Sequence, residues 1–156
     1  KAADPKAEVQ AILRHHDGLD PKAISRQVAV HETVSSDAVH KVLLYENTDA
    51  FVVLPGGVGT FDELWEIACL MQTGKTPKRP IVLVDDAFWT PILDAMYAAM
   101  AMGDQKTIAP EDMRLFTVIK TSGAPAAADA AKPYTITDEG GAVELMRQAR
   151  AERENS

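Results

Sequence analysis

The sequence predicts an α/β fold of the Rossmann type, an open parallel sheet with helices on both faces. Short, continuously apolar runs occur at residues 50–54 and 81–84, and such runs are typical of strands covered on both faces. Each run is followed by a segment with helical apolar spacing, so strands and helices alternate, as parallel strands joined by right-handed crossovers require. The 156 residues, 46% hydrophobic and 25% charged, predict one domain spanning 1–156.

The first part of the chain predicts a helix, a strand and a second helix. The first helix has a capping residue, a first-turn proline, a short apolar face and a terminal glycine: Asp4, Pro5, Val9, Ile12, Leu13 and Gly18. Residues 27–30 predict a brief strand, and Ser35-Ser36-Asp37 offers caps for the next helix. That helix carries three apolar residues on one side: Val39, Val42 and Leu43.

The second part predicts the remaining elements of the sheet. A helix starts at Thr60 and ends at Gly74, and another opens at Thr90-Pro91 and ends near Gly103. Residues 115–119 predict a strand, and residues 121–133 predict a flexible insertion rich in Ala and Pro. A last helix is expected after it, with an apolar side formed by Val143, Leu145 and Met146. The single cysteine, Cys69, lies in an apolar helical pattern and is expected to fill core space.

Composition excludes several classes of function. The net charge of −7 argues against a general nucleic-acid surface. No apolar stretch approaches the roughly 20 residues that cross a bilayer, and no signal peptide is visible, so we expect a cytoplasmic protein without membrane partners. The chain begins at Lys1 instead of Met, so we expect that upstream residues have been processed, trimmed or left out.

A glycine-rich turn follows the apolar run at residues 50–54. Gly56, Gly57 and Gly59 come directly before the expected helix at Thr60. Glycine permits a tight turn with φ > 0 and close approach of backbone N–H groups to an anion. The helix adds unpaired N–H groups and its positive dipole end. We therefore expect residues 56–60, including Val58, to hold a phosphate group, with the Glu63 carboxylate one helical turn further on.

Glu63 also has a purely structural interpretation. Thr60 and Glu63 fit a capping box, in which the glutamate binds back to the N–H of the cap residue. Asp62 and Glu66 can similarly be first-turn acids that favour the helix dipole. The three glycines favour a phosphate site, since a cap does not require them.

Two further motifs are incomplete. Gly74-Lys75-Thr76 resembles the end of a P-loop, but Cys69 stands where that motif needs glycine, so we expect a helix stop. Gly57-Val58-Gly59 resembles the start of a dinucleotide fingerprint, but Asp62 replaces the third glycine. A dinucleotide cofactor is therefore disfavoured.

The four histidines are less informative. His15 and His16 are expected at an exposed helix end, and a lone residue such as His31 is more often structural. His40 and Lys41 lie on the helix before residues 50–54 and are candidates to face the carboxyl end of that strand.

The stretch from Val39 to Val84 resembles the LOG (lonely guy) family, long labelled as lysine decarboxylases and associated with cytokinin riboside 5′-monophosphate phosphoribohydrolase activity. The family pattern P-G-G-x-G-T-x-x-E is complete from Pro55 to Glu63, and Gln72-Thr73-Gly74-Lys75 follows at the typical spacing. Phe88-Trp89 and residues 109–112 look like later landmarks of larger members.

The resemblance implies hydrolysis of the N-glycosidic bond of a nucleoside 5′-monophosphate to free base and ribose 5-phosphate. It further implies a homodimer that uses no metal or other cofactor. Glu63 would be the catalytic carboxylate that stabilises positive charge on the ribose, with Glu66 in support. Gly57, Gly59 and Thr60 would hold the phosphate.

Two departures from the family pattern leave alternatives open. The Arg-Lys pair of the family is His40-Lys41 here, and histidine cannot supply the permanent bidentate fork of arginine. The opening strands of the family have no counterpart before Lys1, so the chain is either the C-terminal portion of a larger fold or obtains strands from another chain. The alternatives are a non-catalytic nucleotide or molybdenum-cofactor carrier, favoured by His40, and a partner-binding α/β domain with a decayed site.

Overall fold

The computed structural model describes residues 9–14, 28–34, 36–46, 48–121 and 132–155. The chain divides into two compact units, residues 1–48 and 49–156, and each is described by itself. The expectation of a single domain remains a prediction. None of the described helices is long and apolar enough to span a membrane.

The first unit contains two strands and a helix. Strands β1 (Val9–Arg14) and β2 (Val28–Val34) pair in parallel, with an irregularity in register after Ala11. Helix α1 (Asp37–Glu46) packs against both strands. The predictions of the strand and of the helix after Ser36 are thus confirmed.

The helix expected between Asp4 and Gly18 is wrong, because β1 occupies the middle of that range. Its apolar face rested on three residues, Val9, Ile12 and Leu13, a number too small to distinguish a helical from an extended period. Pairing along the whole length of β1 decides the conformation, since tertiary contacts override weak local propensity.

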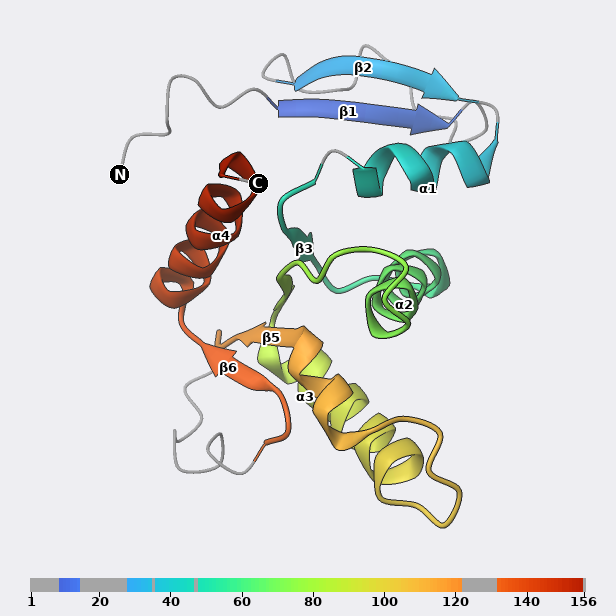
Figure 1. Ribbon diagram of the computed structural model, residues 1–156, viewed down its shortest axis with the longest axis vertical. Coiled ribbons are helices and arrows are strands. Elements are labelled where there is room, and N and C mark those ends of the chain that lie inside the picture. Colours follow the sequence, from blue (N-terminus) through green and yellow to red (C-terminus); the bar gives the residue numbers. More distant parts are fainter. Residues whose placement is uncertain (1–8, 15–27, 35, 47, 122–131, 156) are drawn as a thin grey trace. The chain divides into compact units, whose positions relative to one another are not determined.

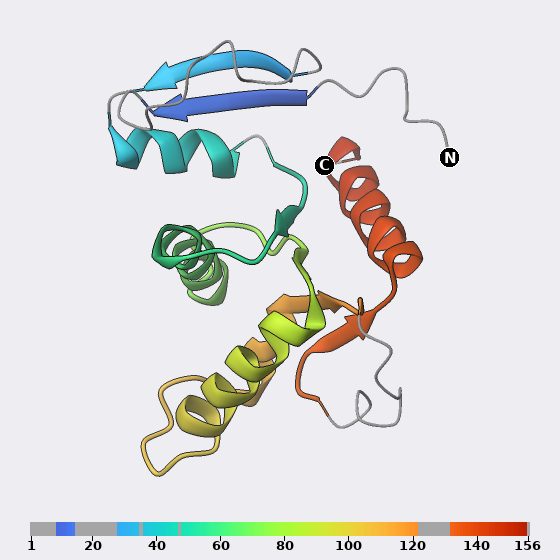
Figure 2. The ribbon, with the colours of Figure 1, turned by 180° about the vertical axis from the view of Figure 1, so that it is seen from behind.

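The second unit is built on a four-stranded, fully parallel sheet in the order β3-β4-β5-β6 (Figures 1 and 2). The strands are β3 (Phe51–Val53), β4 (Ile81–Val84), β5 (Phe116–Ile119) and β6 (Thr135–Thr137). β4 and β5 are central and almost wholly buried, as their apolar runs predict. Within the second unit, β3 lies at the edge of the sheet and Val52 is 55% exposed, which is less burial than its apolar run predicts.

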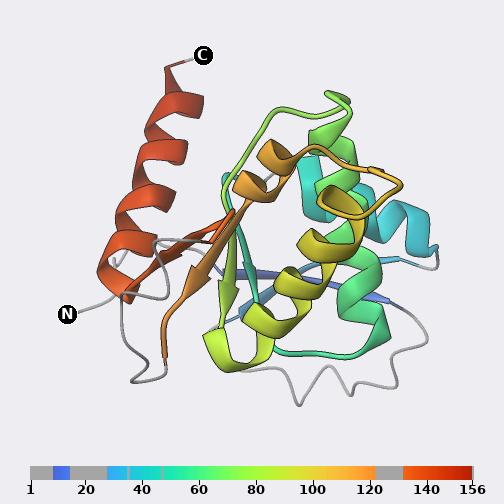
Figure 3. The ribbon, with the colours of Figure 1, turned by 90° about the horizontal axis from the view of Figure 1, so that it is seen from below.

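Helices cover both faces of this sheet (Figure 3). α2 (Val58–Gln72) and α3 (Asp86–Met96) lie on one face, and α4 (Glu139–Glu154) lies on the other. On the α4 side, the core brings together Val82, Val84, Ile119, Ala142, Leu145 and Met146. This arrangement confirms the predicted Rossmann-like α/β class.

Some element boundaries differ from expectation. α3 begins at Asp86, because Asp85 caps it by accepting a hydrogen bond from the N–H of Ala87 (3.1 Å), and Pro91 lies inside the helix. The helix continues as a π-helix over Tyr97–Ala101. A 3-10 helix at Pro110–Leu115 then leads into β5. Residues 122–131 of the predicted flexible insertion lie outside the described residues.

The end of α2 confirms the prediction of a helix stop at Gly74. Gly74 has φ +69, a conformation that glycine adopts without strain. Its N–H donates to the carbonyl of Met71 (3.2 Å), and the N–H of Lys75 donates to that of Leu70 (2.9 Å). These are the two hydrogen bonds of a Schellman motif, so Gly74-Lys75-Thr76 terminates a helix.

Candidate active site

The glycine turn lies at the carboxyl end of β3, where the chain passes directly into α2. In open parallel α/β sheets, ligands bind beyond the carboxyl ends of the strands. The turn is therefore at the edge of the sheet where a ligand is expected.

The start of α2 leaves backbone donors available. The N-cap is Gly57, with φ −93 and ψ −159, and no side chain caps the helix. The first intrahelical bond of this turn runs from the N–H of Phe61 to the carbonyl of Gly57 (3.2 Å). The preceding N–H groups of Val58, Gly59 and Thr60 have no carbonyl one turn earlier in the helix. No acidic side chain lies in the first turn, so the positive end of the helix dipole is not neutralised there.

The capping-box interpretation of Glu63 is wrong. Thr60 lies inside the helix, three residues after the true cap Gly57, and no side chain forms a cap hydrogen bond. The sequence could not distinguish the two starts, because glycine and threonine are both accepted at the N-cap. Glu63 therefore lies in the second turn of α2.

The expected positive φ at the glycines is also wrong. None of Gly56, Gly57 and Gly59 has a positive φ. Steric crowding explains why residue 56 is a glycine, because a Cβ there would lie 2.2 Å from Oγ1 of Thr60. At Gly57 and Gly59, a Cβ would meet no atom within 4 Å. The described part of the chain therefore gives no steric reason for glycine at these two positions, where a side chain would meet open space beside the helix start.

The predicted phosphate-binding residues and both glutamates lie in one short segment at the start of α2. Thr60, Glu63 and Glu66 are spaced by three residues on α2, and such positions are neighbours on a helix surface. The side chains of all three are half-buried, whereas Asp62 is exposed. Two carboxylates thus lie further along the helix from its uncapped N-terminus.

His40 and Lys41 belong to α1 in the first unit. His40 is 8% exposed, and its backbone N–H donates to the backbone carbonyl of Ser36 (3.0 Å). Lys41 is half-buried. The expectation that they face the carboxyl end of β3 remains a prediction.

Two acids at the same edge of the sheet were missed by the sequence analysis. Asp85 and Asp86 follow β4 directly, and Asp86 is buried. Its Oδ1 accepts hydrogen bonds from the N–H (2.9 Å) and the hydroxyl (3.1 Å) of Thr121, which follows β5. These hydrogen bonds connect the segments that follow β4 and β5 at the carboxyl edge of the sheet. The sequence signal that could have identified them is a pair of aspartates directly after a buried strand.

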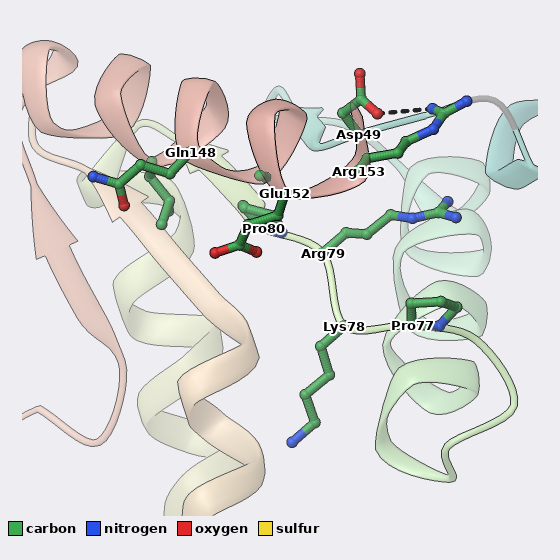
Figure 4. A pocket seen from close by; sticks show the side chains of 10 residues that line it. Asp49, Pro77, Lys78, Arg79, Pro80, Gln148, Glu152 and Arg153 are labelled. Atoms are coloured by element: carbon green, nitrogen blue, oxygen red, sulfur yellow. Dashed lines mark hydrogen bonds and ion pairs between the residues drawn. The ribbon is translucent and has the colours of Figure 1, made fainter. Parts of the chain in front are cut away.

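A hollow of about 380 Å³ lies at the opposite edge of the sheet (Figure 4). Residues 77–80, just before β4, and the last turns of α4 line it. Within it Arg153 donates to Asp49 (2.7 Å), an ion pair that fastens the end of α4 to the segment before β3. The hollow is lined by charged side chains of both signs, and it is separate from the glycine turn.

An apolar groove of about 410 Å³ runs beside α2. Trp65, Ala68 and Cys69 line it from α2, and Met96 and Met100 face them from the following helices. Cys69 is exposed, so the expectation that it fills the core is wrong. It lies next to the buried stripe of α2, which consists of Leu64, Ile67, Ala68 and Met71.

Among the described residues, no group of three or more His, Cys, Asp or Glu side chains could hold a metal ion.

Comparison with known proteins identifies relatives of this chain. A model of the family described as "Possible lysine decarboxylase" matches residues 6–128. A "Cytokinin riboside 5'-monophosphate phosphoribohydrolase" of Mycobacterium tuberculosis is 40% identical over 74 residues, covering 44% of this chain and 39% of the relative. An enzyme of that name from Rhodococcoides fascians is 33% identical over 93 residues, covering 55% of this chain and 47% of the relative. The Arabidopsis thaliana relative of that name, LOG2, is 32% identical over 96 residues, covering 58% of this chain and 45% of the relative.

The chain thus spans less than half of the length of these curated relatives, between 39% and 47%. The family match covers most of the chain and includes the glycine turn and both glutamates. It confirms the resemblance on which the interpretation of Pro55 to Glu63 rested. The chain belongs to the family described as possible lysine decarboxylases, to which the LOG-type phosphoribohydrolases also belong.

Proposed function

We propose that this protein hydrolyses the N-glycosidic bond of a nucleoside 5′-monophosphate, either AMP-like or a cytokinin riboside monophosphate, to the free base and ribose 5-phosphate. One observation carries the proposal. The start of α2 has no side-chain cap and has open space at Gly57 and Gly59, and Glu63 lies one turn further along the same helix. The names of the relatives support the same reaction.

The phosphate is bound first in this scheme. Backbone N–H groups of Val58, Gly59 and Thr60 donate to its oxygens, and the Thr60 hydroxyl adds a further donor. Because this end of the sugar does not react, its binding energy serves to position the ribose for the bond that breaks.

Glu63 acts on the glycosidic bond. As the bond between C1′ and the base nitrogen breaks, positive charge develops on the ribose, and a fixed carboxylate stabilises it. The same carboxylate orients a water molecule and accepts its proton, so the water oxygen bonds to C1′. Glu66, half-buried one turn further along α2, supports the orientation of Glu63.

His40 and Lys41 complete the proposed set. His40 would donate a proton to the leaving base, a general-acid role that an imidazole group can fill. Lys41 would contribute positive charge. Neither side chain replaces the bidentate fork of the family arginine, so we expect slower turnover than in members that keep it.

A panel of nucleoside monophosphates tests the proposal. The full-length protein is incubated with each, and free base and ribose 5-phosphate are measured. We expect cleavage of AMP or an N6-substituted relative, and a loss of at least 100-fold in kcat in Glu63→Gln, because the amide cannot accept the proton of water. Asp62→Asn is the matched control, since it removes the adjacent, exposed carboxylate of the same helix and should leave kcat within threefold.

Two results would count against this proposal. Binding of nucleoside monophosphates without any cleavage would favour the carrier function instead. Full activity of Glu63→Gln would refute the assignment of the catalytic carboxylate while leaving the reaction in place.

We also propose a homodimer, as the family resemblance implies, and a cytoplasmic location, as we expect from the sequence. The apolar groove beside α2 offers surface whose burial would favour association. Sedimentation equilibrium measures the mass directly, and a monomer at micromolar concentration would contradict this part of the proposal.

A further inference from the structure

The first turn of α2 has few side chains to hold it in place. Val58 is 88% exposed, and Gly59 has no side chain. The helix start also lacks a side-chain cap. Further along, α2 is anchored by Leu64 and the rest of its buried stripe. The turn that would bind phosphate is therefore less firmly held than the turn that carries Glu63.

Phe61 provides the main packing contact of this turn. Its ring centroid lies 5.4 Å from that of Trp89 and 6.5 Å from that of Phe88, both on α3, and 6.0 Å from that of Trp65 on α2. These separations fall in the range of favourable aromatic pairs. Phe61 thus connects the helix start after β3 to the helix start after β4.

Trp89 is a rigid support for Phe61. It is fully buried, and its backbone N–H donates to the carbonyl of Asp85 (3.0 Å), which caps α3. Its indole Nε1 has no hydrogen-bond partner in the part of the chain that the structure describes. The indole is held in place by the packing of the core in which it is fully buried, and it contacts the rings of Phe61 and Phe88.

We infer that Phe61 is a positioning residue that keeps the phosphate-binding turn of α2 in a fixed relation to Glu63. This inference rests on the proposed function. Without the ring, the turn at residues 57–60 frays while Leu64 and Ile67 still hold the helix that carries Glu63. A bound phosphate then no longer places the sugar against the carboxylate, and a misplacement of about 1 Å can cost on the order of 100-fold in rate.

The test compares a nucleoside monophosphate with its unphosphorylated nucleoside. Only the monophosphate uses the first turn of α2, so Phe61→Ala should reduce the preference for the monophosphate, the ratio of the two kcat/KM values, by about 100-fold. Phe61→Leu, which keeps an apolar side chain, should recover most of it. Phe88→Ala is the matched control, because it removes an aromatic ring from the same cluster but not from α2, and should change the ratio less than threefold.

Equal slowing of both substrates in Phe61→Ala would overturn the inference, because a loss of folded protein lowers both rates together. A ratio that changes equally in Phe61→Ala and Phe88→Ala would overturn it as well. In either case cleavage by the wild-type protein would leave the proposed function standing.

If the wild-type protein cleaves neither substrate, the proposed function fails and amide hydrogen exchange decides the inference. We expect faster exchange at residues 61–63 in Phe61→Ala than in Phe88→Ala, with little change beyond Leu64. Equal exchange in the two variants would overturn the inference. Trp65 and Trp89 are the two tryptophans of the chain, and both contact Phe61, so a red shift of tryptophan emission in Phe61→Ala provides a further check on the packing.

Discussion

Helices α2 and α4 both begin at glycine-rich sequences, but they satisfy their first turns in different ways. At α4, Asp138 caps the helix by accepting a hydrogen bond from the N–H of Gly141 (2.8 Å), and Glu139 adds an acid to the first turn. At α2, the cap is Gly57, without a side-chain bond or a first-turn acid. α3 follows the pattern of α4, with Asp85 as the cap and Asp86 in the first turn.

This difference indicates how a helix start can be reserved for a ligand. A capped and acidic start already has a partner for its donors and repels a second anion. The start of α2 has neither, and it lies at the carboxyl edge of the sheet. Glycine content alone does not separate the two cases, whereas the residue at the N-cap does.

The largest expected effect comes from giving α2 the cap of α4. Gly57→Asp has room for its side chain, since a Cβ there meets nothing within 4 Å. Its carboxylate should occupy the N–H donors and repel phosphate, weakening nucleoside monophosphate binding about 100-fold. Calorimetric titration measures the binding. Thermal unfolding should show stability unchanged or raised by a few tenths of a kcal/mol.

Gly57→Asn separates the two causes of that loss. Asparagine caps as well as aspartate but carries no charge, so its loss of affinity should be intermediate. An affinity for nucleotide that is the same in wild type, Gly57→Asp and Gly57→Asn would show that the ligand does not use this helix start.

The reverse change at α4 should affect stability instead of binding. Asp138→Ala removes the cap hydrogen bond to Gly141, which we expect to cost about 1 kcal/mol in the free energy of unfolding. Urea denaturation measures this cost. Nucleotide affinity should stay within twofold of wild type, and a large loss of affinity would mean that the two helix starts do not have separate roles.

Gly59→Ala should change stability in the opposite direction to Asp138→Ala. Gly59 lies inside the helix with negative φ and open space around it, so alanine should stabilise the fold by about 0.4–1 kcal/mol. The added methyl group lies beside the phosphate donors and should weaken nucleotide binding about tenfold. Stability that rises without any loss of affinity would place the ligand elsewhere.

Much of the second unit could be predicted from the sequence, because long apolar runs and helical spacing are strong signals. β4, α2, β5 and α4 all appear where expected. β6 was missed, since three residues, Thr135–Thr137, carry too short a pattern to be seen. β1 was read as a helix because its partner strand, and not its own sequence, decides its conformation.

The site was predictable in its residues and less so in its geometry. The motif located the turn between Pro55 and Glu63, but it assigned the cap to Thr60 and a positive φ to the glycines. Backbone angles and the reason for each glycine depend on neighbouring atoms, such as Oγ1 of Thr60 beside Gly56. The Asp86 contacts to Thr121 join residues 35 positions apart, and they could not be seen before the strands were placed.

An NMR titration with inorganic phosphate tests the central claim most directly. Backbone amide shifts are followed in wild type and in Gly57→Asp. We predict the largest shifts at the amides of Val58, Gly59 and Thr60, and their loss in the variant. Shifts that instead concentrate at Lys78 and Arg79, in the hollow at the opposite edge of the sheet, would contradict the account.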